Sequence, residues 1–157
     1  MRAVVACFAL VGFACEVPTT VVAVENQYPT ASNDVVYRAF WQAVRFDMPL
    51  APGNTSDELP TVPASANTAY ALLAPGFDPA STTRPTSIVV LESKSGFSIP
   101  LDTTLHIPID DTTFAGNCAA GSFLSQDQAD FVTERVFQAD MTGLIYDAAT
   151  CTTRSAP

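Results

Sequence analysis

The stretch TSIVVLESKSGFSIPLDTTLHIPI, residues 86–109, decides the fold class of this chain. Short runs rich in Val, Ile, Phe and Thr alternate in it with turn-forming residues, a pattern typical of β-strands. SKSG at 93–96 predicts a hairpin turn, and Asp102 with Thr103 leaves room for little more than a bend. The strands predicted in this stretch cover residues 86–93, 97–101 and 104–109.

Similar short runs recur along the rest of the chain, where twelve Pro interrupt longer helices. They predict further strands at residues 19–26, 35–48, 68–74 and 143–148. Residues 49–67 carry four Pro and predict a long loop with a short strand near 61–64. Many short strands separated by turns predict a mostly-β fold, an antiparallel β-sandwich-like single domain over residues 15–157. We expect a linker at 15–18 and a frayed tail at 152–157.

The segment VVYRAFWQAVRFDM, residues 35–48, fits two structures. Its apolar residues recur at i, i+4 spacing, which would suit an amphipathic helix. Phe40, Val44 and Phe46 also share one face at a spacing of two, and aromatic and β-branched residues favour a pleated surface. The strand is therefore the preferred prediction.

One helix is predicted in SQDQADFVTERVFQ, residues 125–138. Ser125 and Gln128 form a capping box, in which the two side chains satisfy free backbone N–H groups. Asp127 in the first turn and Arg135 near the end suit the helix dipole.

The N-terminus combines one positive charge, Arg2, with a twelve-residue apolar run, AVVACFALVGFA at 3–14. A membrane-spanning helix needs about 20 apolar residues, whereas the apolar region of a secretory signal needs about 7–15. With Ala14 and Cys15 at its end, the stretch resembles a bacterial lipoprotein signal peptide. The resemblance implies that residues 1–14 are removed and that Cys15 is lipidated and becomes the N-terminus. The alternatives are ordinary secretory cleavage after Ala14, or a buried N-terminal element of a cytosolic protein.

The four cysteines fit export. Cys7 would leave with the signal and Cys15 would carry lipid, so that Cys118 and Cys151 remain. Both stand among small and polar residues, and in an oxidising compartment such a pair predicts a disulfide. The alternative is two separate thiols. Two Cys and one His are too few for a closed zinc site, and no cofactor motif is present.

The net charge of the chain is −9. Such acidity repels phosphate backbones, so nucleic acid is not an expected partner. No basic run offers a patch for anionic lipids, and we therefore expect membrane attachment to depend on an acyl anchor at Cys15. The ligand would be a protein or a glycan.

Candidate chemistry centres on the single histidine and on an acidic cluster. Alternation along residues 104–109 places His106 on the polar face of its strand. Asp102, Asp110 and Asp111 surround that strand in the sequence, and such carboxylates suit a hard cation such as calcium. His106 oriented by Asp102 or Asp110 would instead suit a general base.

These features predict an exported, lipid-anchored, small β-rich domain with a non-enzymatic binding or cell-envelope structural role. Its expected location is the bacterial outer membrane or periplasm. One alternative is a secreted enzyme with a site around His106 and the three aspartates. Another is a calcium- or carbohydrate-binding module, in which Tyr37, Phe40 and Trp41 would stack on sugar. Core packing is the simpler explanation for those three aromatics.

Overall fold

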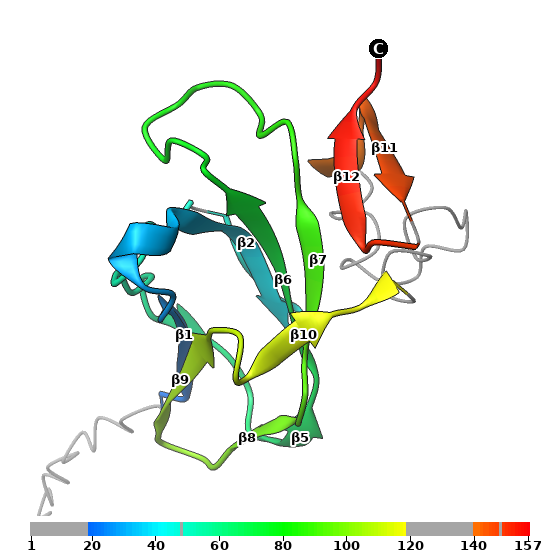
Figure 1. The fold of residues 1–157 in the computed structure, drawn as a ribbon. Coiled ribbons are helices and arrows are strands. Elements are labelled where there is room, and N and C mark those ends of the chain that lie inside the picture. The colour runs from blue at the N-terminus through cyan, green and yellow to red at the C-terminus, as the bar shows by residue number, and fades with distance from the viewer. Residues whose placement is uncertain (1–18, 48, 119–139, 148) are drawn as a thin grey trace, which may run out of the picture.

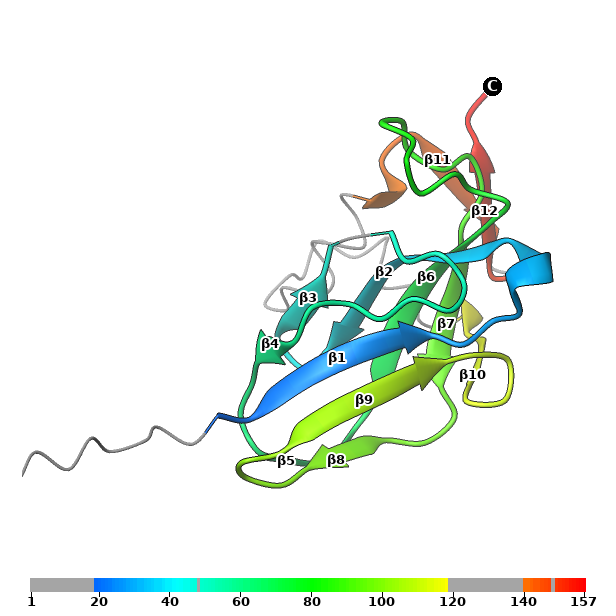
Figure 2. The ribbon, with the colours of Figure 1, turned by 90° about the vertical axis from the view of Figure 1, so that its left-hand side faces the viewer.

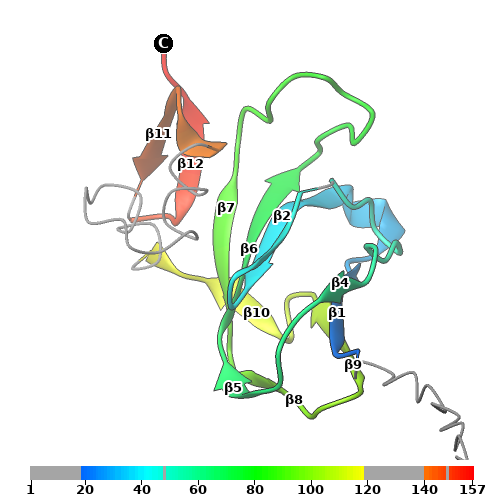
Figure 3. The ribbon, with the colours of Figure 1, turned by 180° about the vertical axis from the view of Figure 1, so that it is seen from behind.

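The computed structural model describes residues 19–47, 49–118, 140–147 and 149–157, and over these it is a mostly-β domain (Figure 1). Two sheets face each other, as the sequence predicts for a β-sandwich-like fold (Figures 2 and 3). The predicted helix at 125–138 lies outside the described residues, as do the signal segment and Cys15.

The smaller sheet has three strands and the larger sheet has seven. The smaller sheet has the order β4 (Leu59–Pro60), β1 (Val21–Asn26) and β9 (Thr104–Ile109). The larger sheet has the order β11 (Leu144–Asp147), β12 (Thr152–Ser155), β7 (Val89–Ser93), β6 (Ala69–Pro75), β2 (Asp34–Trp41) and β3 (Val44–Phe46), with β10 (Phe114–Gly116) also paired to β7. A two-stranded ladder joins β5 (Ala64–Asn67) to β8 (Phe97–Ile99), and a short 3-10 helix covers Thr30–Ser32.

The main core lies between these two sheets because each strand turns alternate side chains inward. In β9, Ile107 and Ile109 are fully buried, whereas His106 on the opposite face is exposed, as the alternation predicts. Trp41 is the largest fully buried side chain. The other principal contributors are Val22, Val24, Val36, Leu73, Leu91, Ile99 and Phe114.

A second, smaller apolar cluster covers the other face of the large sheet. Phe40, Leu72, Ile88 and Val90 are buried there against Met141. Both faces of the central strands therefore carry apolar clusters, and Met141, Leu144 and Tyr146 from the C-terminal segment pack on the second one.

Strand β1 runs parallel to β9, with Ala23 opposite His106 and Glu25 opposite Pro108. The other strand pairs among the described residues are antiparallel. The parallel pair joins segments about 80 residues apart in the chain, and a crossover of that length has no local sequence signal.

The described part of the predicted strand 35–48 is strand, as preferred, but it forms the β2–β3 hairpin, which ends at Phe46, rather than one strand. Trp41 pairs with Val44, which leaves Gln42 and Ala43 as a two-residue loop. Gln42 has φ +52°, a left-handed conformation that usually favours Gly or Asn. The sequence offers neither residue there, so the turn has no ordinary signature.

Two other predictions are wrong. SKSG does not close a hairpin, because β7 pairs with β6, β10 and β12 while β8 pairs with β5. Gly96 instead allows close approach to β5, since a Cβ there would meet Ala66 at 2.9 Å. The tail 152–157 does not fray over its first four residues, because β12 pairs with β11 and β7 and buries Thr153.

Candidate functional site

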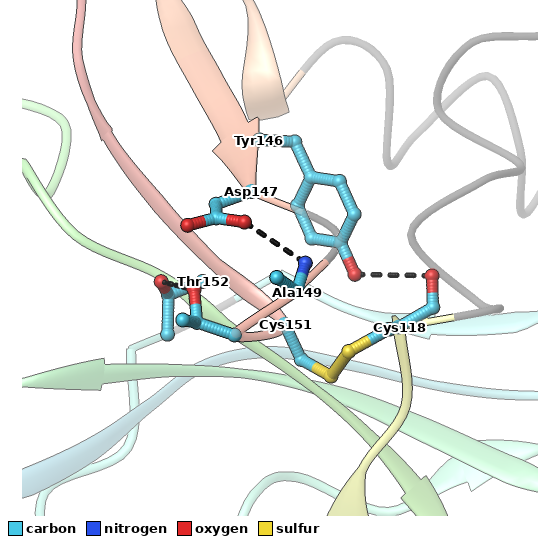
Figure 4. The surroundings of a disulfide bond; sticks show 7 residues. Cys118, Tyr146, Asp147, Ala149, Cys151 and Thr152 are labelled. Carbon is cyan, nitrogen blue, oxygen red and sulfur yellow. Dashed lines mark hydrogen bonds between the residues drawn. A yellow bond between two sulfur atoms is a disulfide. The ribbon is translucent and has the colours of Figure 1, made fainter.

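The two cysteines predicted to pair lie at disulfide distance (Figure 4). Cys118 follows β10 and Cys151 precedes β12, and their Cα atoms are 4.5 Å apart. The backbone carbonyl of Cys151 also accepts a hydrogen bond from the backbone N–H of Val90 at 3.1 Å. The Tyr146 hydroxyl donates to the carbonyl of Cys118 at 3.2 Å. The bridge therefore ties the start of β12 to the chain that follows β10, and both of these strands pair with β7.

A buried ion pair holds the start of the same C-terminal segment. Arg38 on β2 pairs with Asp140, of which 3% is exposed. Arg38 Nε also lies 3.2 Å from Asp47 Oδ1, as an ion pair without hydrogen-bond geometry. Burial raises the pKa of Asp140 above its ordinary value, although the Arg38 and Arg84 guanidinium groups act to lower it. The neighbouring residue, Met141, enters the second apolar cluster.

The end of the segment is held by a buried threonine. Thr153 Oγ1 accepts from the backbone N–H of Ile88 at 2.8 Å, and the Thr153 N–H donates to the Ile88 carbonyl at 2.8 Å. The covalent bridge and this hydroxyl therefore hold β12 against the β7 edge of the large sheet, and the ion pair holds Asp140 and Met141 on one face of that sheet.

His106 lies on the outer face of the β1–β9 pair, beside Glu25. Its Nδ1 is 2.8 Å from Glu25 Oε1, and Glu25 Oε2 accepts from the Gln27 side-chain amide at 2.8 Å. The side chains of His106 and Glu25 are 46% and 29% exposed. The expected polar setting of His106 is present, but its carboxylate partner is Glu25 rather than Asp102 or Asp110. The parallel pairing supplies this partner, which local spacing could not indicate.

The three aspartates are not brought together. Asp102 precedes β9, whereas Asp110 and Asp111 follow it, so the six-residue strand separates them. Asp110 Oδ1 instead accepts from Thr112 N and Oγ1 and from Thr113 N at 2.7–2.9 Å. Slight burial acts to raise the pKa of Asp110, but these hydrogen bonds outweigh it and hold the pKa below its usual value. Within the described part of the chain, no three His, Cys, Asp or Glu side chains are grouped to hold a metal ion.

The aromatic residues considered for sugar stacking belong to the core. Trp41 is 1% exposed and Phe40 is 3% exposed, and they enter opposite faces of the large sheet. Tyr37 is half-buried, with its ring 5.6 Å from that of Phe77 in an edge-on contact. Core packing, the simpler sequence interpretation, therefore accounts for them.

Fold and site define a class: a mostly-β, β-sandwich-like domain whose C-terminal segment is fastened by a disulfide. No protein-family model, curated protein sequence or solved structure matches this chain. No helix in the described ranges is long and apolar enough to cross a membrane.

Proposed function

We propose that this protein is exported and anchored to a bacterial membrane through lipid on Cys15, and that it acts as a non-enzymatic binding or cell-envelope structural domain. The pairing of Cys118 with Cys151 carries the proposal. Disulfides persist in the periplasm and outside the cell, whereas the cytosol keeps thiols reduced. A bridge that joins the chain after β10 to the start of β12 is thus best suited to an exported protein.

The lipid anchor is supported by the sequence at the N-terminus. The apolar run 3–14 resembles a lipoprotein signal, of whose motif Ala14 and Cys15 match the last two positions while Gly12 and Phe13 depart from it, and β1 begins at Val21. Only a short connection therefore separates the acylated residue from the domain. A single acyl chain gives marginal binding, so stable attachment requires the several chains that lipoproteins carry.

A binding or structural role is supported by what the candidate residues do in the fold. Glu25 pairs with His106 on an open sheet face, Asp110 organises a turn, and Asp102 lies at the other end of β9. The secreted-enzyme alternative needs these groups to converge on one reacting atom. The partner of such a domain would be a protein or a glycan.

The test is to express the full chain in a Gram-negative bacterium and to partition the membranes with Triton X-114. We expect the protein in the detergent phase and an acylated Cys15 as its first residue by mass spectrometry. Cys15→Ser should move it to the aqueous phase, whereas the matched variant Cys7→Ser should not. Mature protein that retains Met1 would overturn export, and a mature protein without acyl groups would overturn the anchor.

A further inference from the structure

Two large apolar side chains stand in solvent at one end of the molecule. Val62 is 65% exposed and Leu101 is 56% exposed, and among the described large hydrophobic residues only Ile145 is also exposed, at 39%. Val62 lies in the connection from β4 to β5, and Leu101 lies in the connection from β8 to β9. We call these two residues the tip patch. Pro63 and Pro100, next to them in the chain, are exposed as well.

The tip patch is built around the point at which the N-terminal chain joins the fold. The carbonyl of Thr20 accepts from the backbone N–H of Thr61 at 2.9 Å, and Thr20 Oγ1 accepts from that of Asp102 at 3.1 Å. Each donor is the chain neighbour of a tip-patch residue, and Thr20 is 3% exposed. The neighbours of Val62 and Leu101 therefore hydrogen-bond to Thr20 immediately before β1, and Figure 2 shows β4 and β9 on either side of this strand, at the end where the chain enters.

The register of the β5–β8 ladder supports the same placement. Ala64 pairs with Ile99 in antiparallel register, and Val62 and Leu101 are each two residues beyond that pair. The ladder ends at this pair, so Val62 and Leu101 lie in the two connections that leave the same end of it. The two exposed side chains therefore lie at one end of the molecule.

Cys15 lies only four residues before Thr19. Since an extended chain advances at most about 3.6 Å per residue, Thr19 lies within about 14 Å of Cys15, whatever path the chain takes. With Cys15 acylated, this end of the domain would be held within about two headgroup-layer thicknesses of the acyl chains, since one headgroup region is about 5–7 Å thick.

We propose that the tip patch is a membrane-contacting surface, in which Val62 and Leu101 rest in the headgroup–acyl boundary of the bilayer that holds the Cys15 anchor. The inference rests on the proposed lipid anchor. Apolar contact rather than charge makes this interaction. The exposed Asp102 follows Leu101 and the chain carries a net charge of −9, so neither this neighbour nor the net charge would attract anionic headgroups. Two side chains bind a bilayer weakly, but tethering makes their contact intramolecular and raises the effective concentration.

The experiment attaches the environment-sensitive fluorophore nitrobenzoxadiazole to single introduced cysteines. The acylated full chain carries Val62→Cys or Leu101→Cys, and Thr82→Cys in the β6–β7 connection at the opposite end is the matched control (Figure 1). The native disulfide and the acylated Cys15 leave one free thiol per variant. Each protein is reconstituted into phosphatidylcholine vesicles, and fluorescence emission and quenching by iodide are measured. Circular dichroism checks that each variant is folded.

We expect labels at positions 62 and 101 to shift to the blue and to resist iodide when vesicles are present. The label at position 82 should stay red-shifted and fully quenched. The same labels on Cys15→Ser protein should not respond to vesicles, because the tip patch alone is too weak to hold the protein.

Three results would overturn the proposal, and they are distinguishable. Labels at 62 and 101 that are quenched as fully as the label at 82, on protein shown to be acylated, would remove the tip-patch contact and leave the anchor standing. Absence of acylation by mass spectrometry would remove both. A blue shift that appears without vesicles and grows with protein concentration would assign the patch to a second copy of this chain.

Discussion

Replacing Arg38 by Met should destabilise the domain strongly at neutral pH, because it strands the buried carboxylate of Asp140. Removing one partner of a buried ion pair typically costs about 3–5 kcal/mol. The lower end, about 3 kcal/mol, is expected here, since Arg84 and Arg45 also act on Asp140 and remain in the variant. The methionine stem keeps the apolar packing of the arginine side chain.

The loss should depend on pH with a definite sign. The pKa of Asp140 is raised in the folded protein, and removing Arg38 should raise it further. The folded state then binds more protons than the unfolded state between the unfolded pKa, near 3.9, and the raised folded pKa. Stability of the variant therefore falls as pH rises through that window, and the difference from the parent protein should shrink toward pH 4.

Urea denaturation of the disulfide-intact protein at pH 4 and pH 7 measures this effect. Arg38→Met combined with Asp140→Asn should recover most of the loss at pH 7, because no buried charge is left unpaired. The matched control is Arg45→Met, whose exposed pair with Asp47 should be worth no more than about 0.5 kcal/mol. A loss below about 1 kcal/mol for Arg38→Met, or an equal loss at both pH values, would refute the reasoning.

Three further predictions concern other parts of the fold. Cys118→Ser combined with Cys151→Ser should lower the free energy of unfolding by about 3–4 kcal/mol, which is the chain-entropy value for a closed loop with a sequence separation of 33. Urea denaturation measures this loss, and an unchanged free energy of unfolding would contradict the bridge. His106→Gln should change stability by no more than about 0.5 kcal/mol in the same assay, since the imidazole is nearly half exposed; a larger loss would indicate a structural role. Asn26→Ala should lower the free energy of unfolding by about 3 kcal/mol, because the buried Asn26 amide donates to the carbonyls of Asp34 and Leu50 at 2.8 Å each. Thermal unfolding measures this loss. An unfolding temperature close to that of the parent protein would show that water replaces the lost amide.

Period-two alternation was sufficient to predict the strands that have one face in the core. The run 104–109 matches β9 residue for residue, because Ile107 and Ile109 alternate with polar positions. The run 68–74 matches β6 to within one residue at each end. Cys118 and Cys151 could also be paired from sequence, since counting left only these two.

Features fixed by distant neighbours had no such signal. Thr152–Ser155 is a polar stretch that reads as a tail, and it becomes β12 only because Ile88 and the disulfide hold Thr153 against β7. Glu25 and His106 are 81 positions apart and meet through the parallel β1–β9 pairing. The turn at Gln42 is imposed by the hairpin around it rather than by a local preference.

The disulfide, the buried ion pair and the proposed lipid anchor together restrict where a partner could bind. The ion pair of Arg38 holds Asp140 and Met141 over the second apolar cluster, so that part of the large sheet's outer face is already covered, and the disulfide holds β12 at the sheet's edge. The proposed anchor places the tip patch against the bilayer. Among the described residues, two surfaces remain open to a partner protein or glycan: the opposite end, with the β6–β7 connection, β11 and the C-terminus (Figures 1 and 2), and the outer face of β1 and β9 that carries Glu25 and His106. With the proposed anchor, the first of these surfaces points away from the membrane.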